Sequence, residues 1–215
     1  MKPYYQDKWV TIYHGDCREI LPQLPELYGQ VDLAIADFPF KHDKPLADFV
    51  ADASEGLLVD GGNLLVIDNP HNLFKSANAF SAFILRNEIV LVRKREFCPA
   101  WHLGFKHNNA LLLYKGDAKG IWYGNVINHR HTFADVMVDC HKPYKKHPEA
   151  IDIKWAELMT NLLSREHSIV VDWFCGSGTF AEVCSRMNRS YIGFEIEERY
   201  CEIAARRCSQ EVMEL

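Results

Sequence analysis

A carboxylate followed by a proline and aromatic residues is the first candidate for chemistry in this sequence. Asp37, Phe38, Pro39 and Phe40 follow the apolar run 31–36, which predicts a buried parallel strand. Ligands of open parallel sheets bind at the carboxyl ends of the strands. A carboxylate and a backbone carbonyl there can accept both hydrogens of a base amine and stabilise its developing positive charge. An aromatic ring can stack on a base rotated out of a duplex. The alternative is a strand-capping aspartate beside two core phenylalanines.

A glycine turn is the second candidate. The segment 172–179, which contains Gly176 and Gly178, follows the apolar run 169–171 and precedes a helical stretch. Glycines let a ligand approach the backbone closely, and the first amides of a helix offer unpaired donors. Glu195 ends the next predicted strand, at a distance typical of an acid that accepts both hydroxyls of a ribose. The alternative is a tight turn that binds no ligand.

The glycine turn resembles a known cofactor loop. The S-adenosylmethionine (SAM) loop of DNA amino-methyltransferases usually has the form D-P-F-x-G-S-G-T. The alternative interpretation of the turn is a dinucleotide-binding fingerprint, G-x-G-x-x-G, with Ala181 in its last position. The residues that carry the resemblance are Asp172, Trp173, Phe174, Cys175, Gly176, Ser177, Gly178 and Thr179, with Trp173 in the place of the proline. The resemblance implies that these residues and Glu195 bind SAM.

The first candidate resembles the D-P-P-Y motif of the same family. Asp37, Pro39 and Phe40 match its first, third and aromatic positions, and Phe38 replaces its second proline. The double proline stiffens the loop, so its loss could misplace the carbonyl that faces the amine. The resemblance implies methyl transfer from SAM to an exocyclic amine of DNA. An aspartate in first place favours N6 of adenine, and N4 of cytosine is the alternative.

Two further segments are similar to cofactor contacts of this family. Asp16 and Cys17 precede a predicted helix and match a segment that contacts the adenine of SAM, although Asp16 could serve only as a helix cap. His147 lies in a K-H-P sequence that opens the helix on the methionine end of the cofactor. The usual continuation T-Q-K-P is replaced by 149–152, so the alternative for His147 is a simple cap.

Charge is distributed unevenly along the chain. The formal net charge is −5, but residues 86–146 contain eleven Lys and Arg against five Asp and Glu. A basic middle on an acidic frame predicts a DNA-facing surface, with an ordinary solvated face as the alternative. The target-recognition region is therefore expected at about 93–145. Its candidate DNA contacts are Arg93, Lys94, Arg95, His129, Arg130 and His131.

Hydrophobic periodicity predicts the elements that must position these residues. The resemblance implies a Rossmann-like α/β fold with a mostly parallel seven-stranded sheet and helices on both faces. The amine motif precedes the glycine loop, which is the permuted order of the beta group. Strands are expected at 9–13, 31–36, 63–67, 88–92, 107–114, 169–171 and 190–194, and helices at 18–24, 44–58, 73–85, 153–163, 179–187 and 197–212.

Length and composition predict one catalytic domain over residues 1–215. Seven cysteines without a C-x-x-C pair, and no apparent signal peptide, predict reduced thiols in the cytoplasm. No membrane span and no metal are expected, and a homodimer is plausible. Two rival functions remain: an amine methyltransferase for RNA, protein or a small molecule, and a DNA- or SAM-binding protein that has lost catalysis.

Overall fold

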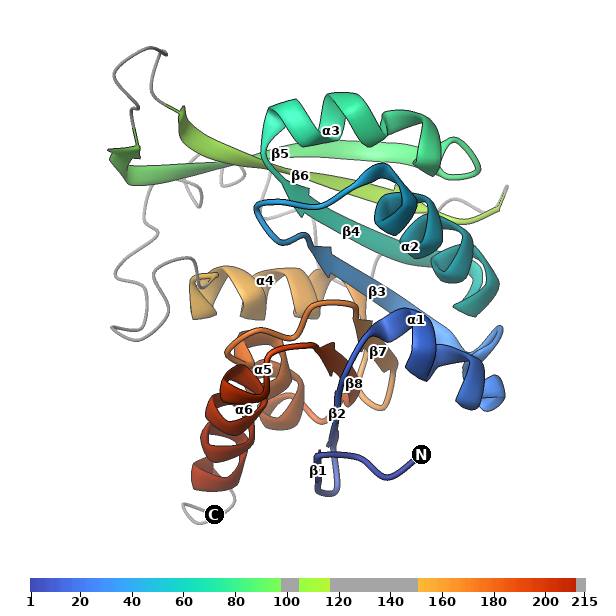
Figure 1. Cartoon of the computed structure of the whole chain (residues 1–215), viewed down its shortest axis with the longest axis vertical. Helices are drawn as coiled ribbons and strands as arrows, with labels where there is room; N and C mark the ends of the chain where they lie inside the picture. The colour runs from blue at the N-terminus through green and yellow to red at the C-terminus, as the bar shows by residue number, and fades with distance from the viewer. Residues whose placement is uncertain (98–104, 117–150, 212–215) are drawn as a thin grey trace.

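The computed structural model describes residues 1–97, 105–116 and 151–211 (Figure 1). Its centre is an eight-stranded mixed sheet. The strands are β1 (Tyr5–Gln6), β2 (Val10–His14), β3 (Val31–Asp37), β4 (Leu58–Asp68), β5 (Ile84–Phe97), β6 (Phe105–Tyr114), β7 (Ile169–Asp172) and β8 (Ser190–Glu195). Their order across the sheet is β1-β2-β8-β7-β3-β4-β6-β5.

The sheet is parallel in its middle and antiparallel at both ends. Strands β2, β8, β7, β3 and β4 pair in parallel, whereas β1, β6 and β5 pair antiparallel with their neighbours. All seven predicted strands are present. The count of seven is wrong for the described residues, because the short β1 pairs with β2 as an eighth strand.

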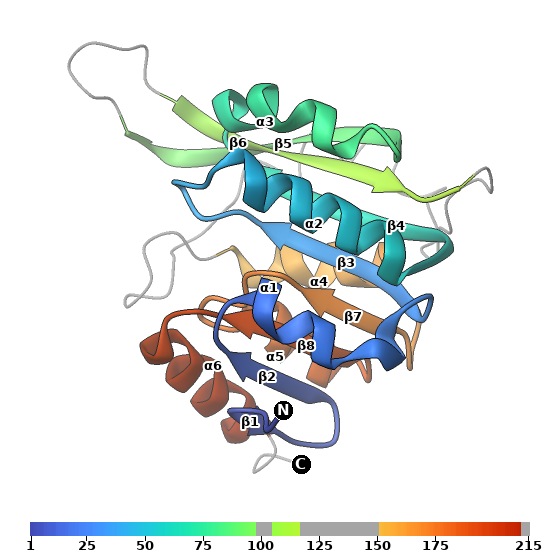
Figure 2. The ribbon, with the colours of Figure 1, turned by 45° about the vertical axis from the view of Figure 1, so that its right-hand side comes forward.

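Helices cover both faces of the sheet, as predicted (Figures 1 and 2). One face carries α1 (Cys17–Ile20), α2 (Lys44–Leu57) and α3 (Pro70–Ser76), and the other carries α4 (Ile153–Leu163), α5 (Thr179–Arg186) and α6 (Glu198–Glu211). Side chains of β3 alternate between two apolar cores: Leu33 and Ile35 pack toward α4 and α5, and Ala34 and Ala36 pack toward α2. None of the helices in the described ranges combines the length and apolar character needed to cross a bilayer.

The predicted extent of the helix over 73–85 is wrong. Asn69 caps α3, which ends at Ser76 and passes into a 3₁₀ turn at Ala77–Phe80. Phe83 is buried and ends a turn closed on Phe80, and β5 begins at Ile84. The apolar spacing continued past the helix because both phenylalanines enter the same core. The predicted helix over 18–24 also ends early, at Ile20, and continues as a 3₁₀ turn that contains Pro22.

The strand order reverses between the parallel neighbours β3 and β7. The chain passes from β3 through α2 to β4 on one side, and from β7 through α5 to β8 on the other. At such a switch point the loops leave neighbouring strand ends in opposite directions and open a crevice where ligands bind. The loops after β3 and β7 contain the two candidate motifs.

Candidate active site

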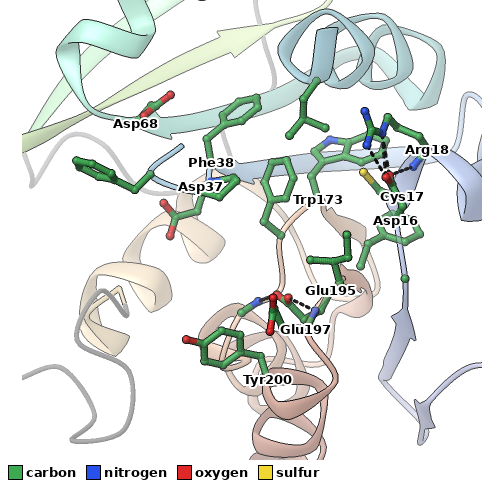
Figure 3. A pocket seen from close by; sticks show the side chains of 18 of the residues that line it. Asp16, Cys17, Arg18, Asp37, Phe38, Asp68, Trp173, Glu195, Glu197 and Tyr200 are labelled. Atoms are coloured by element: carbon green, nitrogen blue, oxygen red, sulfur yellow. Dashed lines mark hydrogen bonds and ion pairs between the residues drawn. The ribbon is translucent and has the colours of Figure 1, made fainter. Parts of the chain in front are cut away.

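The two motifs leave adjacent strand ends. Ile35 pairs with Asp172 in the parallel ladder, and the Trp173 amide donates a hydrogen bond to the Ile35 carbonyl at 2.9 Å. Asp37 and Phe174 therefore begin their loops at the same edge of the sheet. Figure 3 shows Asp37 and Glu195 on two sides of one space at this edge.

A cavity of about 510 Å³ occupies the crevice, within the size range of small-molecule sites. Both Asp37 and Gly176 line it, so the predicted shared cleft is present. One wall comes from β3, β4 and the residues after them, and the other from α1, β8 and α6. The predicted site residues on these walls are Asp16, Cys17, Asp37, Phe38, Pro39, Phe40, Trp173, Phe174, Gly176 and Glu195.

Phe38 anchors the loop between β3 and α2, residues 38–43, at a position where a proline was expected. This segment is called the amine-site loop. The Phe38 amide donates a hydrogen bond to the Ile67 carbonyl at 3.0 Å, which extends the pairing of β3 with β4. A proline has no N–H and cannot form this bond. The Phe38 ring is 6% exposed, with its centroid 5.1 Å from that of Phe174 and 4.4 Å from that of His42. Packing and a backbone hydrogen bond thus hold the loop at this position.

Phe40 lies at the rim of the cavity. Its side chain is 63% exposed, and its carbonyl accepts a hydrogen bond from Asn72 Nδ2 at 3.3 Å. Its backbone is thus fixed while its aromatic ring is open to solvent. Such a ring can stack on a planar group that enters the cavity.

The glycine turn uses its two glycines differently. Both have left-handed backbone angles, with φ of +53° at Gly176 and +79° at Gly178. A Cβ on Gly178 would lie 2.7 Å from Cβ of Ala204 in α6, so this glycine permits helix packing. A Cβ on Gly176 would meet nothing closer than 3.9 Å, and its amide donates to Glu195 Oε2 at 2.8 Å. Gly176 therefore faces the cavity with open space.

Glu195 is oriented by backbone amides. Besides the Gly176 bond, its Oε1 accepts a hydrogen bond from the Glu197 amide at 2.8 Å, and the residue is only 9% exposed. Each oxygen keeps further acceptor capacity. The carboxylate is held on the cavity wall in a form suited to accept hydroxyl groups.

Asp172 has different surroundings. It is 2% exposed, accepts hydrogen bonds from the Tyr191 hydroxyl at 2.9 Å and the Phe174 amide at 3.1 Å, and does not line the cavity. Burial raises the pKa of Asp172 to about 7 despite these two bonds. Its side chain braces the turn from beneath.

Four other residues of the turn also point away from the cavity. The Cys175 side chain is buried, and burial raises the pKa of its thiol well above the ordinary value. Arg207 of α6 donates to the Ser177 carbonyl at 3.4 Å and to the Thr179 hydroxyl at 3.1 Å. Cys175, Ser177, Gly178 and Thr179 therefore pack within the protein or against α6 and do not line the cavity.

Asp16 and Cys17 lie on the opposite wall. Asp16 caps α1, as predicted, by accepting the Arg18 amide at 2.9 Å, and it forms an ion pair with the Arg18 guanidinium at 2.5 Å. Hydrogen bonds from Arg18 lower the pKa of Asp16. The preceding Gly15 amide bonds the Glu195 carbonyl at 2.8 Å, so this wall is tied directly to β8.

A family model described as DNA methylase (N6_N4_Mtase) matches residues 46–206. The chain belongs to this DNA methylase family. It is similar to the type II methyltransferase M.BamHI of Bacillus amyloliquefaciens, with 28% identity over 255 residues that cover 96% of this chain and 59% of that protein. The chain thus spans about three-fifths of that relative. The chain is also similar to the type II methyltransferase M2.LlaDCHI of Lactococcus lactis subsp. cremoris, with 24% identity. That match covers 97% of this chain and 93% of the relative.

Two solved structures resemble this chain over most of its length. The M1.HpyAVI–SAM complex superposes with a TM-score of 0.74 at 22% identity, over 93% of this chain and 98% of that one. The cytosine-N4-specific PvuII DNA methyltransferase superposes with a TM-score of 0.77 at 16% identity, over 96% of this chain and 88% of that one. The predicted Rossmann-like methyltransferase fold is therefore confirmed for this member of the DNA methylase family.

The other predicted contacts are His147 and the candidate DNA contacts. His147, His129, Arg130 and His131 fall outside the described residues. Arg93, Lys94 and Arg95 lie within β5, which continues to Phe97, so the predicted end of the strand at residue 92 is wrong. Pairing with β6, up to Phe97 opposite Phe105, extends the strand through the cationic run.

Several cavity residues were missed from the sequence. Asp68 ends β4 beside β3, and the rule that selected Asp37 at a strand end would also have selected it. Ile196, Glu197 and Tyr200 follow β8 and line the cofactor side of the cavity. No pattern of residue types distinguished these three from an ordinary helix start. Across the described part of the chain, no three potential metal-ligating side chains converge.

Proposed function

We propose that this chain transfers a methyl group from SAM to the N6 amine of adenine in DNA. The observation that carries the proposal is the pair of carboxylates, Asp37 after β3 and Glu195 at the end of β8, on the walls of one cavity. Membership of the DNA methylase family supports DNA as the substrate. The related M1.HpyAVI and Thermus thermophilus TTHA0409 structures contain SAM, which supports this cofactor.

The residues present fit SAM. Gly176 leaves open space where a side chain would block a ligand, and Glu195 retains acceptor capacity for two ribose hydroxyls. Asp16 on the facing wall would contact the adenine end, and Phe174 the methionine end. When bound, SAM supplies an electrophilic methyl group.

The residues of the other wall act on the amine. Asp37 would accept a hydrogen bond from the exocyclic amine and stabilise the positive charge that develops on its nitrogen. Phe40, exposed at the rim, would stack on the flipped base. An aspartate in the first motif position favours adenine, and cytosine N4 is the second candidate because the family includes both kinds of enzyme.

The test is incubation of mixed-sequence DNA with methyl-labelled SAM, followed by nucleoside analysis. We expect labelled N6-methyladenine, and none with an Asp37→Ala variant. Labelled N4-methylcytosine alone would overturn the choice of base. Label transferred only to RNA or protein would overturn DNA as the substrate, and SAM binding without any transfer would identify a binding protein that has lost catalysis.

DNA recognition and assembly are part of the same proposal. We propose the region 93–145 as the target-recognition region of a single catalytic domain, and a homodimer as the assembly. Replacement of Arg93, Lys94 and Arg95 by alanine should weaken DNA binding and reduce its salt dependence. Light scattering of the purified chain, alone and with DNA, tests the dimer.

A further inference from the structure

A buried ion pair lies behind the amine-site loop. His42 Nε2 is 2.5 Å from Asp68 Oδ2, and the two side chains are 4% and 2% exposed. His42 belongs to the loop between Phe40 and α2, and Asp68 ends β4 and lines the cavity. Figure 3 shows Asp68 in the same wall as Phe38 and Asp37. Buried charges are costly unless paired, so this pair calls for a role.

The carboxylate of Asp68 is a hub of hydrogen bonds. Its Oδ1 accepts the Asn69 amide at 2.7 Å, Asn69 Nδ2 at 3.0 Å and Asn72 Nδ2 at 3.0 Å. Asn72 Nδ2 also donates to the Phe40 carbonyl at 3.3 Å. The hub therefore contacts the loop at two points, directly through His42 and through Asn72 at Phe40.

His42 also packs on the residue that replaces the second proline. Its ring centroid lies 4.4 Å from that of Phe38, with an angle of 31° between the planes. Phe38 is fixed on its other side by the Ile67 carbonyl. The loop is thus held at Phe38, Phe40 and His42, on both sides of Pro39.

We propose that His42 and Asp68 are a positioning pair that fixes the amine-site loop and so aims the Asp37 carboxylate. The inference rests on the proposed function for the identity of the reaction. The pair replaces the stiffness of a double proline with an electrostatic anchor, and it gives this site a dependence on pH that a proline cannot give.

The geometry suits the charged form of His42. Its two ring nitrogens face two oxygens: Nε2 faces Asp68, and Nδ1 lies 3.3 Å from the Asp43 carbonyl. Only the imidazolium has a hydrogen for both. The charged groups that act on His42 are the carboxylates of Asp68, from β4, and Asp43, at the start of α2. Burial lowers the pKa of His42, but these bonds and charges outweigh it and raise the pKa overall.

The test compares wild type with His42→Gln and His42→Ala in single-turnover methyl transfer at saturating SAM. Glutamine can still donate to Asp68, so we expect the alanine variant to lose on the order of 10²-fold in rate and the glutamine variant to lose less. SAM affinity should change less than about twofold, because the pair lies on the amine side of the cavity. The exposed His71→Gln is the matched control and should behave as wild type.

The pH profile separates positioning from general stability. The wild-type rate should fall as pH rises through the raised pKa of His42, and the glutamine variant should lack this fall. A His42→Ala variant with wild-type rate and pH profile would overturn the inference. Equal losses of rate for the glutamine and alanine variants with an unchanged pH profile would also overturn it, because they would indicate packing alone.

Two readouts do not depend on catalysis. Hydrogen exchange of the amides at 38–43 should be faster in His42→Ala, and the His42 pKa measured by NMR should be lower in Asp68→Asn than in wild type. If both hold while no nucleic acid is methylated, the proposed function fails and the anchor stands. If neither changes in a folded, active enzyme, the anchor fails and the proposed function stands.

Discussion

Two carboxylates flank the glycine turn and take different parts in the site. Glu195 is oriented by the amides of Gly176 and Glu197 and lines the cavity. Asp172 is buried, accepts a hydrogen bond from the Tyr191 hydroxyl and is not among the residues that line this cavity. The sequence made both of them candidates for SAM, Glu195 through its place at the end of the next strand and Asp172 through the resemblance of the turn to a SAM loop. Their hydrogen-bond partners decide that Glu195 is available to a ligand while Asp172 supports the turn.

Asp37→Ala should lower the rate of methyl transfer strongly and leave cofactor binding intact. Loss of a group that stabilises charge in the transition state typically lowers the rate by about 10²–10³-fold. Single-turnover methylation measures this loss, and calorimetry should give a SAM Kd within about twofold of wild type. Asp48→Ala, a change at a half-buried residue on α2 that does not line the cavity, is the control. A wild-type rate in Asp37→Ala would contradict the assignment.

Glu195→Gln should weaken SAM binding. A hydrogen bond to a charged group contributes about 1.5–3 kcal/mol, so Kd should rise roughly 10- to 100-fold. The single-turnover rate at saturating SAM should fall much less. Glu202→Gln, an exposed change on α6, serves as the control. An unchanged Kd in the Glu195 variant would count against its contact with the ribose.

At the scale of elements, the glycine turn depends on how closely α6 packs against it. Gly178 has a left-handed backbone and faces Ala204 of α6, whereas Gly176 has similar angles and open space. Arg207 of the same helix bonds Ser177 and Thr179. The position of α6 is therefore coupled to the shape of the turn.

Gly178→Ala should destabilise the fold more than Gly176→Ala does. Both changes carry about 1–2 kcal/mol for a left-handed alanine. Gly178→Ala adds about 1–3 kcal/mol for overlap with Ala204. Urea unfolding measures both, and a second change, Ala204→Gly, should recover part of the added loss. Equal destabilisation by the two alanines would contradict the packing role of Gly178.

The sequence predicted most elements because their residue types and environments agree. Strands such as β3 and β7 are apolar runs that end in an aspartate, and both are buried in the sheet. The prediction of one helix over 73–85 was wrong because the buried apolar residues of this region lie in a short helix and the turns after it, and they pack in one core. Asp68 lies at a strand end, as Asp37 does, and the same rule would have found it, whereas Tyr200 lines the cavity only through tertiary neighbours that no local pattern encodes.

At the scale of the whole molecule, one strand pair joins the two halves of the site. β3 leads to the amine-site loop and β7 leads to the glycine turn, and these two strands pair directly at the centre of the sheet. The sequence predicted this meeting, since both motifs follow buried strands whose carboxyl ends share one edge of a parallel sheet. It could not predict the buried supports of each half, Asp172 with Tyr191 and Asp68 with His42.

Burial of Asp172 should give the fold a dependence on pH. Its pKa is about 7 in the folded chain and about 3.9 when unfolded. Between these values the folded chain holds a proton that the unfolded chain has released, so this group's contribution to the free energy of unfolding declines as pH rises. Asp172→Asn should lack this decline. Denaturant unfolding of both proteins from about pH 4 to about pH 8 measures it, and parallel curves would contradict it.

The hydrogen bond from the Phe38 amide to the Ile67 carbonyl bears on how this protein can evolve. Replacement of Phe38 by proline would match the second position of the D-P-P-Y motif that the loop resembles, yet it would remove that bond and the ring against His42 in the same step. Lineages that carry this loop should retain phenylalanine and histidine together or exchange them together.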